Sequence, residues 1–453
     1  MNSTPISSDL YRGKKCIVFG LGRSGLAAAR LLLRSGARVT VCDSSSSPAI
    51  QEKAAIIRKE GILVHTGEEV ERVALAADIS YDLAVLSPGI EETTPPVALV
   101  TSKGTPLIGE LELAFTLCGC PVVAITGTNG KTTTTELATC MLQGAGLRTV
   151  SCGNIGTTMS EMVASGKTWD VLVVEVSSFQ LETIRSFRPK VAVWLNLSPN
   201  HLDRYPSMSE YRAAKLRIFE NQTGEDIAIL PSQEDLPGVK SRKITFSPTD
   251  PGADIFLDGG VITYHGKALL PLQETRLRGA HNTSNLMAAL GCGIALGADP
   301  ELMAKAIRDY LPPVHRCELI SERGGVQWVN DSKATNLDAM EKAICSVSGP
   351  LVLIAGGKDK GFEFAPIEPL VRERVSFAIL IGEMKERIAR DWSLTPCCIS
   401  ESLEDAVALA AVKATPGGTV LFSPGTSSFD MFRDYIERGE MFRRLVLRLP
   451  EQD

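Results

Sequence analysis

Short apolar runs alternate with segments of helical periodicity along most of the 453 residues of this chain. Many of the runs are rich in Val, Ile and Leu and end in a glycine-containing or otherwise polar turn. This alternation is typical of parallel sheets that are covered by helices. The pattern therefore predicts an α/β protein, and its changes along the chain divide it into three blocks with boundaries near residues 110 and 311.

The first block, residues 1–110, has the pattern of a Rossmann-like domain. Its expected strands are 15–19, 38–43 and 83–86, with a helix at 24–34. The turn Gly20-Leu-Gly-Arg-Ser-Gly25 has the spacing of a dinucleotide-binding loop, and Asp43 ends the next strand, where an acidic residue can bind a ribose. The pattern predicts a nucleotide or pyrophosphate on this turn and leaves NAD and a nucleotide-sugar equally open. Glycines needed only for helix–strand packing are the alternative.

The second block, residues 111–311, contains the strongest motif of the chain. Its expected strands are 121–126, 171–175 and 191–195, with a hairpin at 255–264. The segment Gly127-Thr-Asn-Gly-Lys-Thr-Thr133 lies between a predicted strand and a predicted helix, where backbone N–H groups and the helix N-terminus can bind a phosphate. Two residues separate its glycines, whereas the standard phosphate-binding loop has four. A tight turn with an incidental lysine is the alternative.

Two side chains near this loop suit a magnesium nucleotide. Lys131 would reach the β- and γ-phosphates, and Thr132 would offer its hydroxyl to Mg²⁺. Glu175 ends an apolar strand that would lie beside the loop, so we expect it to bind Mg²⁺ as well. A solvated strand end is the alternative interpretation of Glu175.

The third block, residues 312–453, predicts another parallel sheet. Its expected strands are 327–329, 351–355, 377–381 and 420–422, followed by a last helix from about residue 429. Polar loops at 330–336, 356–360 and 423–428 leave three of these strands. Because the carboxyl ends of parallel strands meet at one edge, we expect one crevice, made attractive to an anion by Lys333, Lys358 and Lys360.

Composition excludes several classes of protein. The chain has 47 Lys and Arg against 53 Asp and Glu, with a net charge of −6 and 11 scattered cysteines. This balance argues against a nucleic-acid-binding protein, and no apolar run reaches the roughly 18 residues of a membrane span. The N-terminus lacks the apolar core of a secretion signal. We therefore expect a cytoplasmic protein without disulfides or structural zinc, and without nucleic-acid or membrane partners.

Further motifs complete a family pattern over essentially the whole chain. They are Gly153-Asn-Ile-Gly156, Ser177–Leu181, Asn196, Asn200-His201, Asp203–Pro206, Tyr211–Lys215, His281-Asn282, Asn285, His315-Arg316 and Asn330–Asn336. In order and spacing the chain resembles the Mur ligases, most of all the members that add D-glutamate to UDP-N-acetylmuramoyl-L-alanine. The short phosphate loop is the form that this family uses. The resemblance implies a UDP-substrate domain (1–110), an ATP-binding domain (111–311) and an amino-acid-binding domain (312–453).

The resemblance also implies site residues. ATP would be bound by Gly127, Thr128, Asn129, Gly130, Lys131, Thr132, Thr133, Asn285, Arg316 and Asp331. The UDP-substrate would be bound by Gly22, Arg23, Ser24, Asp43, Ser44, Gly89, Asn154 and His201. D-Glutamate would be bound by Lys333, Thr335, Lys360, Ser428, Phe429 and Tyr435. Two Mg²⁺ ions would be held by Thr132, Glu175, His201 and Lys215, the last as an N-carboxylated lysine. Lys131, His201 and Lys215 would serve catalysis, although by pattern alone Lys215 is a surface charge on a helix.

The implied reaction is the ATP-dependent formation of an amide through an acyl phosphate, with ADP and phosphate as products, in peptidoglycan precursor synthesis. The family pattern favours a monomer in which the last domain closes over the site about a hinge near residue 312. The sequence leaves three other interpretations open: another ligase of the same superfamily, including one acting on folate; a nicotinamide-dependent oxidoreductase built on residues 20–25; and a non-catalytic phosphate-loop switch protein. The last two leave the three polar loops of the third block unexplained.

Overall fold

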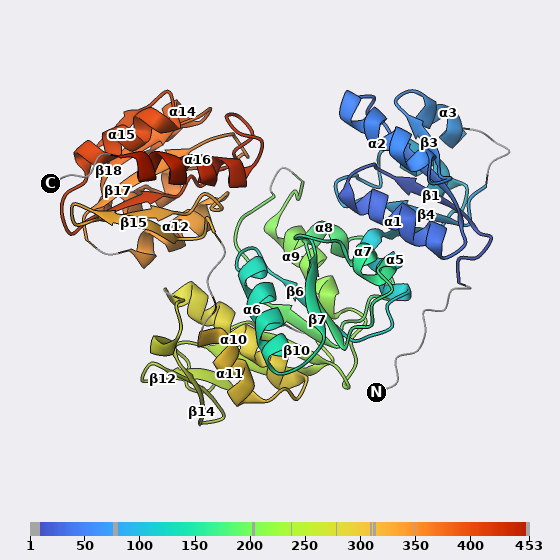
Figure 1. The fold of residues 1–453 in the computed structure, drawn as a ribbon, viewed down its shortest axis with the longest axis horizontal. Coiled ribbons are helices and arrows are strands. Elements are labelled where there is room, and N and C mark those ends of the chain that lie inside the picture. The colour runs from blue at the N-terminus through green and yellow to red at the C-terminus, as the bar shows by residue number, and fades with distance from the viewer. Residues whose placement is uncertain are drawn as a thin grey trace. The chain divides into compact units, whose positions relative to one another are not determined.

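The computed structural model describes residues 10–75, 80–201, 204–236, 238–277, 279–308, 310, 314–347 and 349–449. The chain folds into two compact units. The first comprises Met1–Asn196, Ser209–Thr275 and Ser284–Asp309, and the second comprises Leu197–Met208, Arg276–Thr283 and Tyr310–Asp453. Each unit consists of sheets flanked by helices (Figure 1), so the predicted α/β class is confirmed. The expected hinge near residue 312 lies outside the described residues.

The first unit contains a five-stranded parallel sheet with the order β3-β2-β1-β4-β5. Its strands are β1 (Lys15–Phe19), β2 (Arg38–Asp43), β3 (Leu63–Thr66), β4 (Leu83–Leu86) and β5 (Leu107–Gly109). Its helices are α1 (Arg23–Arg34), α2 (Pro48–Arg58), α3 (Glu69–Leu75), α4 (Pro95–Ser102) and α5 (Glu110–Thr116). Strand β4 and residues 16–19 of β1 are apolar and buried because helices cover both faces of a doubly wound sheet. The three predicted strands of this block are confirmed.

The first unit also contains a nine-stranded sheet with the order β14-β13-β12-β11-β10-β9-β6-β8-β7. Its strands are β6 (Val122–Thr126), β7 (Thr149–Gly153), β8 (Val171–Glu175), β9 (Val191–Trp194), β10 (Ile227–Pro231), β11 (Arg242–Ser247), β12 (Ile255–Asp258), β13 (Val261–Tyr264) and β14 (Lys267–Pro271). Its helices are α6 (Lys131–Gly144), α7 (Met159–Ala164), α8 (Ser178–Leu181), α9 (Met208–Leu216), η1 (Arg217–Phe219), η2 (Leu272–Glu274), α10 (Ala280–Ala295) and α11 (Pro300–Arg308). Met208 of α9 and residues 280–283 of α10 belong to the second unit.

Only the strand pairs β12–β13 and β13–β14, at one side of this sheet, are antiparallel. Strands β12 and β13 form the predicted hairpin, and β14 continues it. The turn between β12 and β13 is Gly259-Gly260, with φ of 54° and 86°. Two adjacent residues with positive φ are what a two-residue hairpin turn of type I′ requires, so glycine fits both positions.

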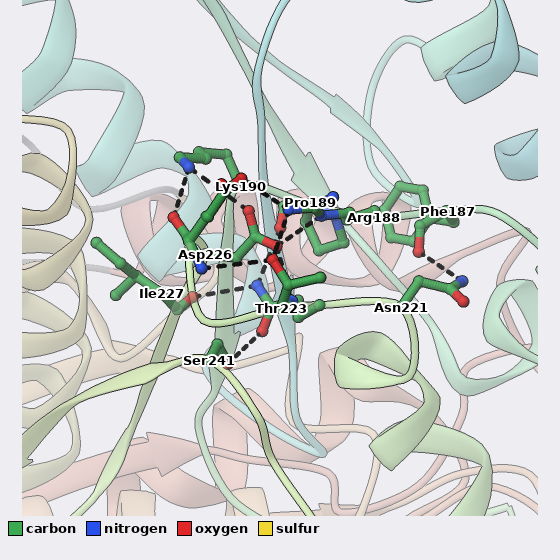
Figure 2. A network of polar contacts seen from close by, with 11 residues as sticks. Phe187, Arg188, Pro189, Lys190, Asn221, Thr223, Asp226, Ile227 and Ser241 are labelled. Atoms are coloured by element: carbon green, nitrogen blue, oxygen red, sulfur yellow. Dashed lines mark hydrogen bonds and ion pairs between the residues drawn. The ribbon is translucent and has the colours of Figure 1, made fainter.

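A polar network joins the amino ends of β9 and β10 (Figure 2). Arg188 Nε donates to Asp226 Oδ2 at 2.6 Å, and the backbone N–H of Thr223 donates to the same oxygen at 2.9 Å. Burial acts to raise the pKa of Asp226, but these hydrogen bonds hold it below its usual range. Nearby, Ser241 Oγ donates to Gln222 Oε1 at 2.8 Å. The network stabilises the edge of the sheet opposite to the phosphate loop.

The second unit contains a six-stranded sheet with the order β15-β16-β20-β17-β18-β19, in which only β15 is antiparallel to its neighbour. Its strands are β15 (Glu318–Arg323), β16 (Val326–Asn330), β17 (Leu351–Gly356), β18 (Val375–Ile381), β19 (Cys397–Ile399) and β20 (Thr419–Phe422). Its helices are α12 (Leu337–Ser346), η3 (Ala365–Ile367), α13 (Glu368–Arg374), α14 (Lys385–Asp391), α15 (Leu403–Lys413) and α16 (Tyr435–Arg448). Among the described residues, no helix is long and apolar enough to cross a membrane.

The prediction that the last helix starts near Phe429 is wrong. Helix α16 begins at Tyr435, because the Asp434 side chain accepts hydrogen bonds from the N–H groups of Ile436 and Glu437 and caps the helix there. The preceding residues form turns, and Phe429 is exposed. The apolar spacing continues past the start of the helix, so periodicity alone placed the boundary too early.

Candidate active site

The glycine-rich segment forms a tight loop between β6 and α6. The Asn196 side chain fixes this loop: its Oδ1 accepts from Asn129 N at 2.9 Å, and its Nδ2 donates to Asn129 O at 3.1 Å. Gly130 has a φ of 82°, and a Cβ there would lie 2.3 Å from Asn285 Oδ1. Asn285, a buried residue of α10 and an expected ATP ligand, therefore lies against the loop. The N-terminus of α6 follows at once, which is the arrangement of a phosphate-binding site.

Lys131 is the first residue of α6 and folds back over the loop. Its Nζ donates to Gly127 O at 3.0 Å and to Thr128 O at 2.9 Å. The side chain is half-buried, whereas those of Thr132 and Thr133 are buried. A cation is thus held where the loop would receive the phosphates of a nucleotide.

Glu175 ends β8 next to this loop, since it pairs in register with Ile125 of β6. The Glu175 side chain is buried: its Oε1 accepts from Asn154 Nδ2 at 2.8 Å, while its Oε2 has no hydrogen-bond partner among the described residues. A buried carboxylate oxygen without a partner is costly, so Glu175 fits a cation ligand better than a structural role. Asn154, predicted at the UDP-substrate, also orients Glu175.

Lys215 is buried beside the same loop, so its interpretation as a surface charge is wrong. It is 1% exposed, its Nζ donates to Gly127 O at 2.9 Å, and it lies 4.7 Å from the centre of the Tyr211 ring. Burial and the nearby charge of Lys131 hold the pKa of Lys215 well below its usual value, and the Glu175 charge opposes this only in part. Burial beside this loop therefore favours the uncharged amine of Lys215 more strongly than solvent does at an exposed lysine.

The magnesium expectation fits this edge only in part. Thr132, Glu175 and Lys215 lie on elements that meet at the phosphate loop. The described part of the chain nevertheless holds no group of three or more His, Cys, Asp or Glu side chains suited to a metal ion. One buried carboxylate and one hydroxyl would suit a first Mg²⁺ only with further ligands from phosphate and water. The expected second Mg²⁺ would need a further anion, which Lys215 would supply only in its expected N-carboxylated form.

The glycines that follow the first sheet's strands fall into two kinds: one is needed for close helix–strand packing, and others leave the backbone open to a ligand. A Cβ on Gly25 would lie 2.0 Å from Gly20 O, so this glycine is needed for close helix–strand contact. In contrast, nothing lies within 4 Å of a Cβ on Gly22 or Gly89, and both are exposed. Open backbone at the start of α1 suits a pyrophosphate. Ser24, on the first turn of α1, is half-buried.

Two predicted UDP-substrate residues already have protein partners. The Asp43 carboxylate accepts from the N–H groups of Leu21 at 2.7 Å and Ser45 at 2.9 Å, while Ser44 is exposed. The Arg23 guanidinium donates to Gly156 O and, at 3.5 Å, to Asn154 O. Arg23 thus connects the first sheet to the loop that orients Glu175.

In the second unit the three polar loops meet at one edge of the sheet, as predicted. They follow the neighbouring parallel strands β16, β20 and β17. Backbone hydrogen bonds join them: Gly425 N donates to Ala334 O at 2.9 Å, and Lys358 N donates to Ser427 O at 2.9 Å. The predicted D-glutamate residues lie on or near these loops. Ser428 is buried; Lys333, Thr335, Lys360 and Tyr435 are half-buried; and Phe429 is 65% exposed.

Asp331 is the carboxyl group at this edge whose pKa departs most from its usual value. Its Oδ2 accepts from Ser423 Oγ at 2.8 Å and its Oδ1 accepts from Cys317 N at 3.2 Å. Burial raises its pKa to about 7, and these bonds together with the charge of half-buried Arg316 only moderate the shift. His201, which has a φ of 56°, belongs to the second unit with Arg316 and Asp331. The meeting of these three residues with the phosphate loop stays a prediction.

Three family models match the chain. They are described as "Mur ligase MurD-like, N-terminal domain" over residues 14–109, "Mur ligase middle domain" over 125–293 and "Mur ligase, glutamate ligase domain" over 315–425. The UDP-N-acetylmuramoylalanine–D-glutamate ligases of Geobacter metallireducens and Geotalea uraniireducens are each 44% identical to the chain. The alignment with the Geobacter metallireducens ligase covers 96% of this chain and 97% of that ligase. The alignment with the Geotalea uraniireducens ligase covers 97% of this chain and 98% of that ligase.

Solved structures share the fold at low sequence identity. The UDP-N-acetylmuramate–alanine ligase MurC of Thermotoga maritima aligns with a TM-score of 0.60 at 17% identity, over 96% of this chain and 99% of that one. The MurF ligase of Thermotoga maritima, solved in complex with ADP, aligns with a TM-score of 0.58 at 17% identity, over 98% of both chains. The family models and the full-length relatives show that this chain belongs to the Mur ligase family.

Proposed function

We propose that this chain joins D-glutamate to UDP-N-acetylmuramoyl-L-alanine at the expense of ATP, with ADP and phosphate as products. One observation carries the proposal: Lys131, the buried Glu175 carboxylate and the buried Lys215 gather at one phosphate loop. The chain also aligns over nearly its full length with ligases named for D-glutamate addition. We propose domains at 1–110, 111–311 and 312–453 for the UDP-substrate, ATP and the amino acid.

The first chemical step joins two anions, so its main demand is charge neutralisation. The carboxylate of the UDP-substrate attacks the γ-phosphorus of ATP, and ADP leaves to give an acyl phosphate. Lys131 and the backbone N–H groups of the loop would stabilise the charge that develops on the phosphate oxygens. Asn154 would hold both Glu175 and the acyl end of the UDP-substrate.

The buried amine of Lys215 supports the expected N-carboxylation of this residue on chemical grounds. An uncharged amine can add carbon dioxide and release a proton, which yields a carbamate, whereas an ammonium cannot. Thr132, Glu175, His201 and carboxylated Lys215 would hold two Mg²⁺ ions, which when bound neutralise the charge of the transferred phosphoryl group. Without the carbamate, Lys215 offers no anionic ligand.

In the second step the amine of D-glutamate attacks the acyl phosphate, and the tetrahedral intermediate collapses to an amide and phosphate. The cationic loops of the second unit suit a substrate with two carboxylates, and Lys333 and Lys360 carry the charge for this contact. Exclusion of water would protect the acyl phosphate from hydrolysis.

Trapping the acyl phosphate tests the proposal. The chain is incubated with ATP, Mg²⁺ and UDP-N-acetylmuramoyl-L-alanine, and hydroxylamine converts any acyl phosphate to a hydroxamate. We expect a hydroxamate that depends on ATP and on the UDP-substrate, and its loss in Lys131→Met. Binding of NADH without any binding of the UDP-substrate would instead support an oxidoreductase.

A further inference from the structure

Arg438, on the first turn of α16, is a buried cation without an ion-pair partner among the described residues. It is 1% exposed. Its Nε donates to Ser332 Oγ at 3.1 Å, and its Nη2 donates to Ser332 O at 2.8 Å and to Thr426 O at 3.1 Å. Its Nη1 donates to Ser427 O at 3.2 Å. All the acceptors of this guanidinium are uncharged oxygens.

A buried arginine without an ion-pair partner is an unfavourable residue for filling a protein core. Removing a cation from water costs several kcal/mol, and an apolar residue of similar volume often gives equal or greater stability. Burial lowers the pKa of Arg438 to about 10, while the charges of Asp430 and Asp331 act in the opposite direction. Arg438 stays charged at neutral pH, so a role beyond packing would explain why a cation occupies this buried position.

The hydrogen bonds of Arg438 join the loops that leave the sheet. Ser332 lies in the loop after β16, and Thr426 and Ser427 lie in the loop after β20. The oxygen of Ser427 also accepts from the N–H of Lys358, in the loop after β17. One rigid, planar group therefore sets the spacing of two loops directly and of the third through a shared acceptor.

The same turn of α16 is fitted tightly to the sheet. Asn330 Nδ2 donates to Gly439 O at 3.0 Å, and a Cβ on Gly439 would lie 2.3 Å from His315 Nδ1. Ser332 Oγ donates in turn to Tyr435 O at 2.9 Å. Because these contacts hold the backbone of α16 against the end of β16, the Arg438 side chain has little freedom to move away from the loops.

We propose that Arg438 is a positioning residue for the amino-acid subsite, which keeps the three loops in register and adds a positive charge beneath them. The charge favours an amino acid with two carboxylates over a neutral one. Lys333, Thr335 and Ser428 lie on the loops that Arg438 joins, and Lys360 lies on the loop reached through Ser427. This inference rests on the proposed function, since it assigns the subsite to D-glutamate.

Three variants test the inference in the full chain. Arg438→Lys keeps the charge but loses the planar fork, and Arg438→Gln loses both. Ser332→Ala removes one acceptor and leaves the cation in place. The matched control is Arg444→Gln, which changes an exposed arginine of the same helix. For each variant the KM values for D-glutamate, ATP and the UDP-substrate, the acyl phosphate formed without D-glutamate and the thermal unfolding temperature are measured.

We expect the KM for D-glutamate to rise about tenfold or more in Arg438→Lys and further in Arg438→Gln, and about threefold in Ser332→Ala. Acyl-phosphate formation and the KM values for ATP and the UDP-substrate should stay within about twofold of the wild type, and Arg444→Gln should behave as the wild type. A purely structural arginine would change all of these quantities together with the unfolding temperature.

An unchanged KM for D-glutamate in folded Arg438→Lys would overturn the inference. If Arg438→Gln does not fold, Arg438→Lys and Ser332→Ala still decide between the two outcomes. The wild type separates this inference from the proposed function: a wild type that forms no acyl phosphate contradicts the proposed function itself. An active wild type whose variants keep the KM for D-glutamate contradicts only the role of Arg438.

Discussion

The raised pKa of Asp331 predicts that the second unit loses stability as the pH rises. In the folded chain burial raises this pKa from 3.8 to about 7, so the native state binds the proton more tightly than the unfolded state does. The stabilisation is fully present below the unfolded pKa of 3.8 and is lost as the pH rises through about 7. Replacement by asparagine removes the titrating group and keeps its size.

The magnitude follows from the two pKa values. One pKa unit corresponds to about 1.4 kcal/mol, and part of the loss has already occurred at pH 5, above the unfolded pKa. Between pH 5 and pH 8 the unfolding free energy of the wild type should fall relative to that of Asp331→Asn by about 2–3 kcal/mol.

Urea unfolding at both pH values measures this difference. Trp328 and Trp392 lie in the second unit, whereas Trp169 and Trp194 lie in the first. In a background with Trp169→Phe and Trp194→Phe the fluorescence therefore reports on the second unit alone. Other titrating groups are common to the wild type and Asp331→Asn, so they cancel in the difference.

An equal pH dependence in the two proteins would refute the reasoning. It would show that Asp331 is ionised at pH 5 in the folded chain, which requires stronger compensation than Ser423, Cys317 and Arg316 provide. An opposite slope would mean that the carboxylate is held below its usual pKa and acts as a structural anion.

Three further predictions concern the first unit. Lys215→Ala should abolish turnover, and bicarbonate should restore the activity of the CO₂-depleted wild type but not that of the variant. Wild-type activity that does not depend on bicarbonate would contradict the carboxylation of Lys215. Gly130→Ala should raise the KM for ATP and lower stability by about 1–3 kcal/mol, because φ is positive and the new Cβ meets Asn285; unchanged ATP kinetics would contradict the loop geometry. Glu112→Gln should lower stability by about 2–4 kcal/mol, because its buried carboxylate accepts three backbone N–H groups and a hydroxyl; urea unfolding measures the change, and a loss below about 1 kcal/mol would contradict it.

Ten of the parallel strands were predictable because each contains a short apolar run that ends in a glycine or a polar loop. Strands β3, β5, β7, β10, β11 and β19 were not predicted, since most of them are shorter or more polar. The phosphate loop was predictable because a glycine-rich turn followed by Lys131 has a local meaning. The meeting of the three loops of the second unit also follows from local signals, because the carboxyl ends of neighbouring parallel strands share an edge.

Long-range contacts account for what the sequence did not predict. Lys215 lies in a polar helical segment, and only the fold brings its amine to Gly127, 88 residues away. Arg438 stands between Glu437 and Glu440, so its pattern favours a solvated face, whereas its acceptors lie on distant loops. Asp43 has the position of a ribose ligand, and its carboxylate accepts from the N–H groups of Ser45 and of Leu21, which lies in the glycine-rich turn after β1.

Release of phosphate is the most direct test of the central claim. The full chain is incubated with ATP, Mg²⁺ and UDP-N-acetylmuramoyl-L-alanine, and each L- and D-amino acid is added singly. We expect sustained release only with D-glutamate, and none when the UDP-substrate is omitted. Release that depends on a different amino acid, or that proceeds without the UDP-substrate, would contradict the account.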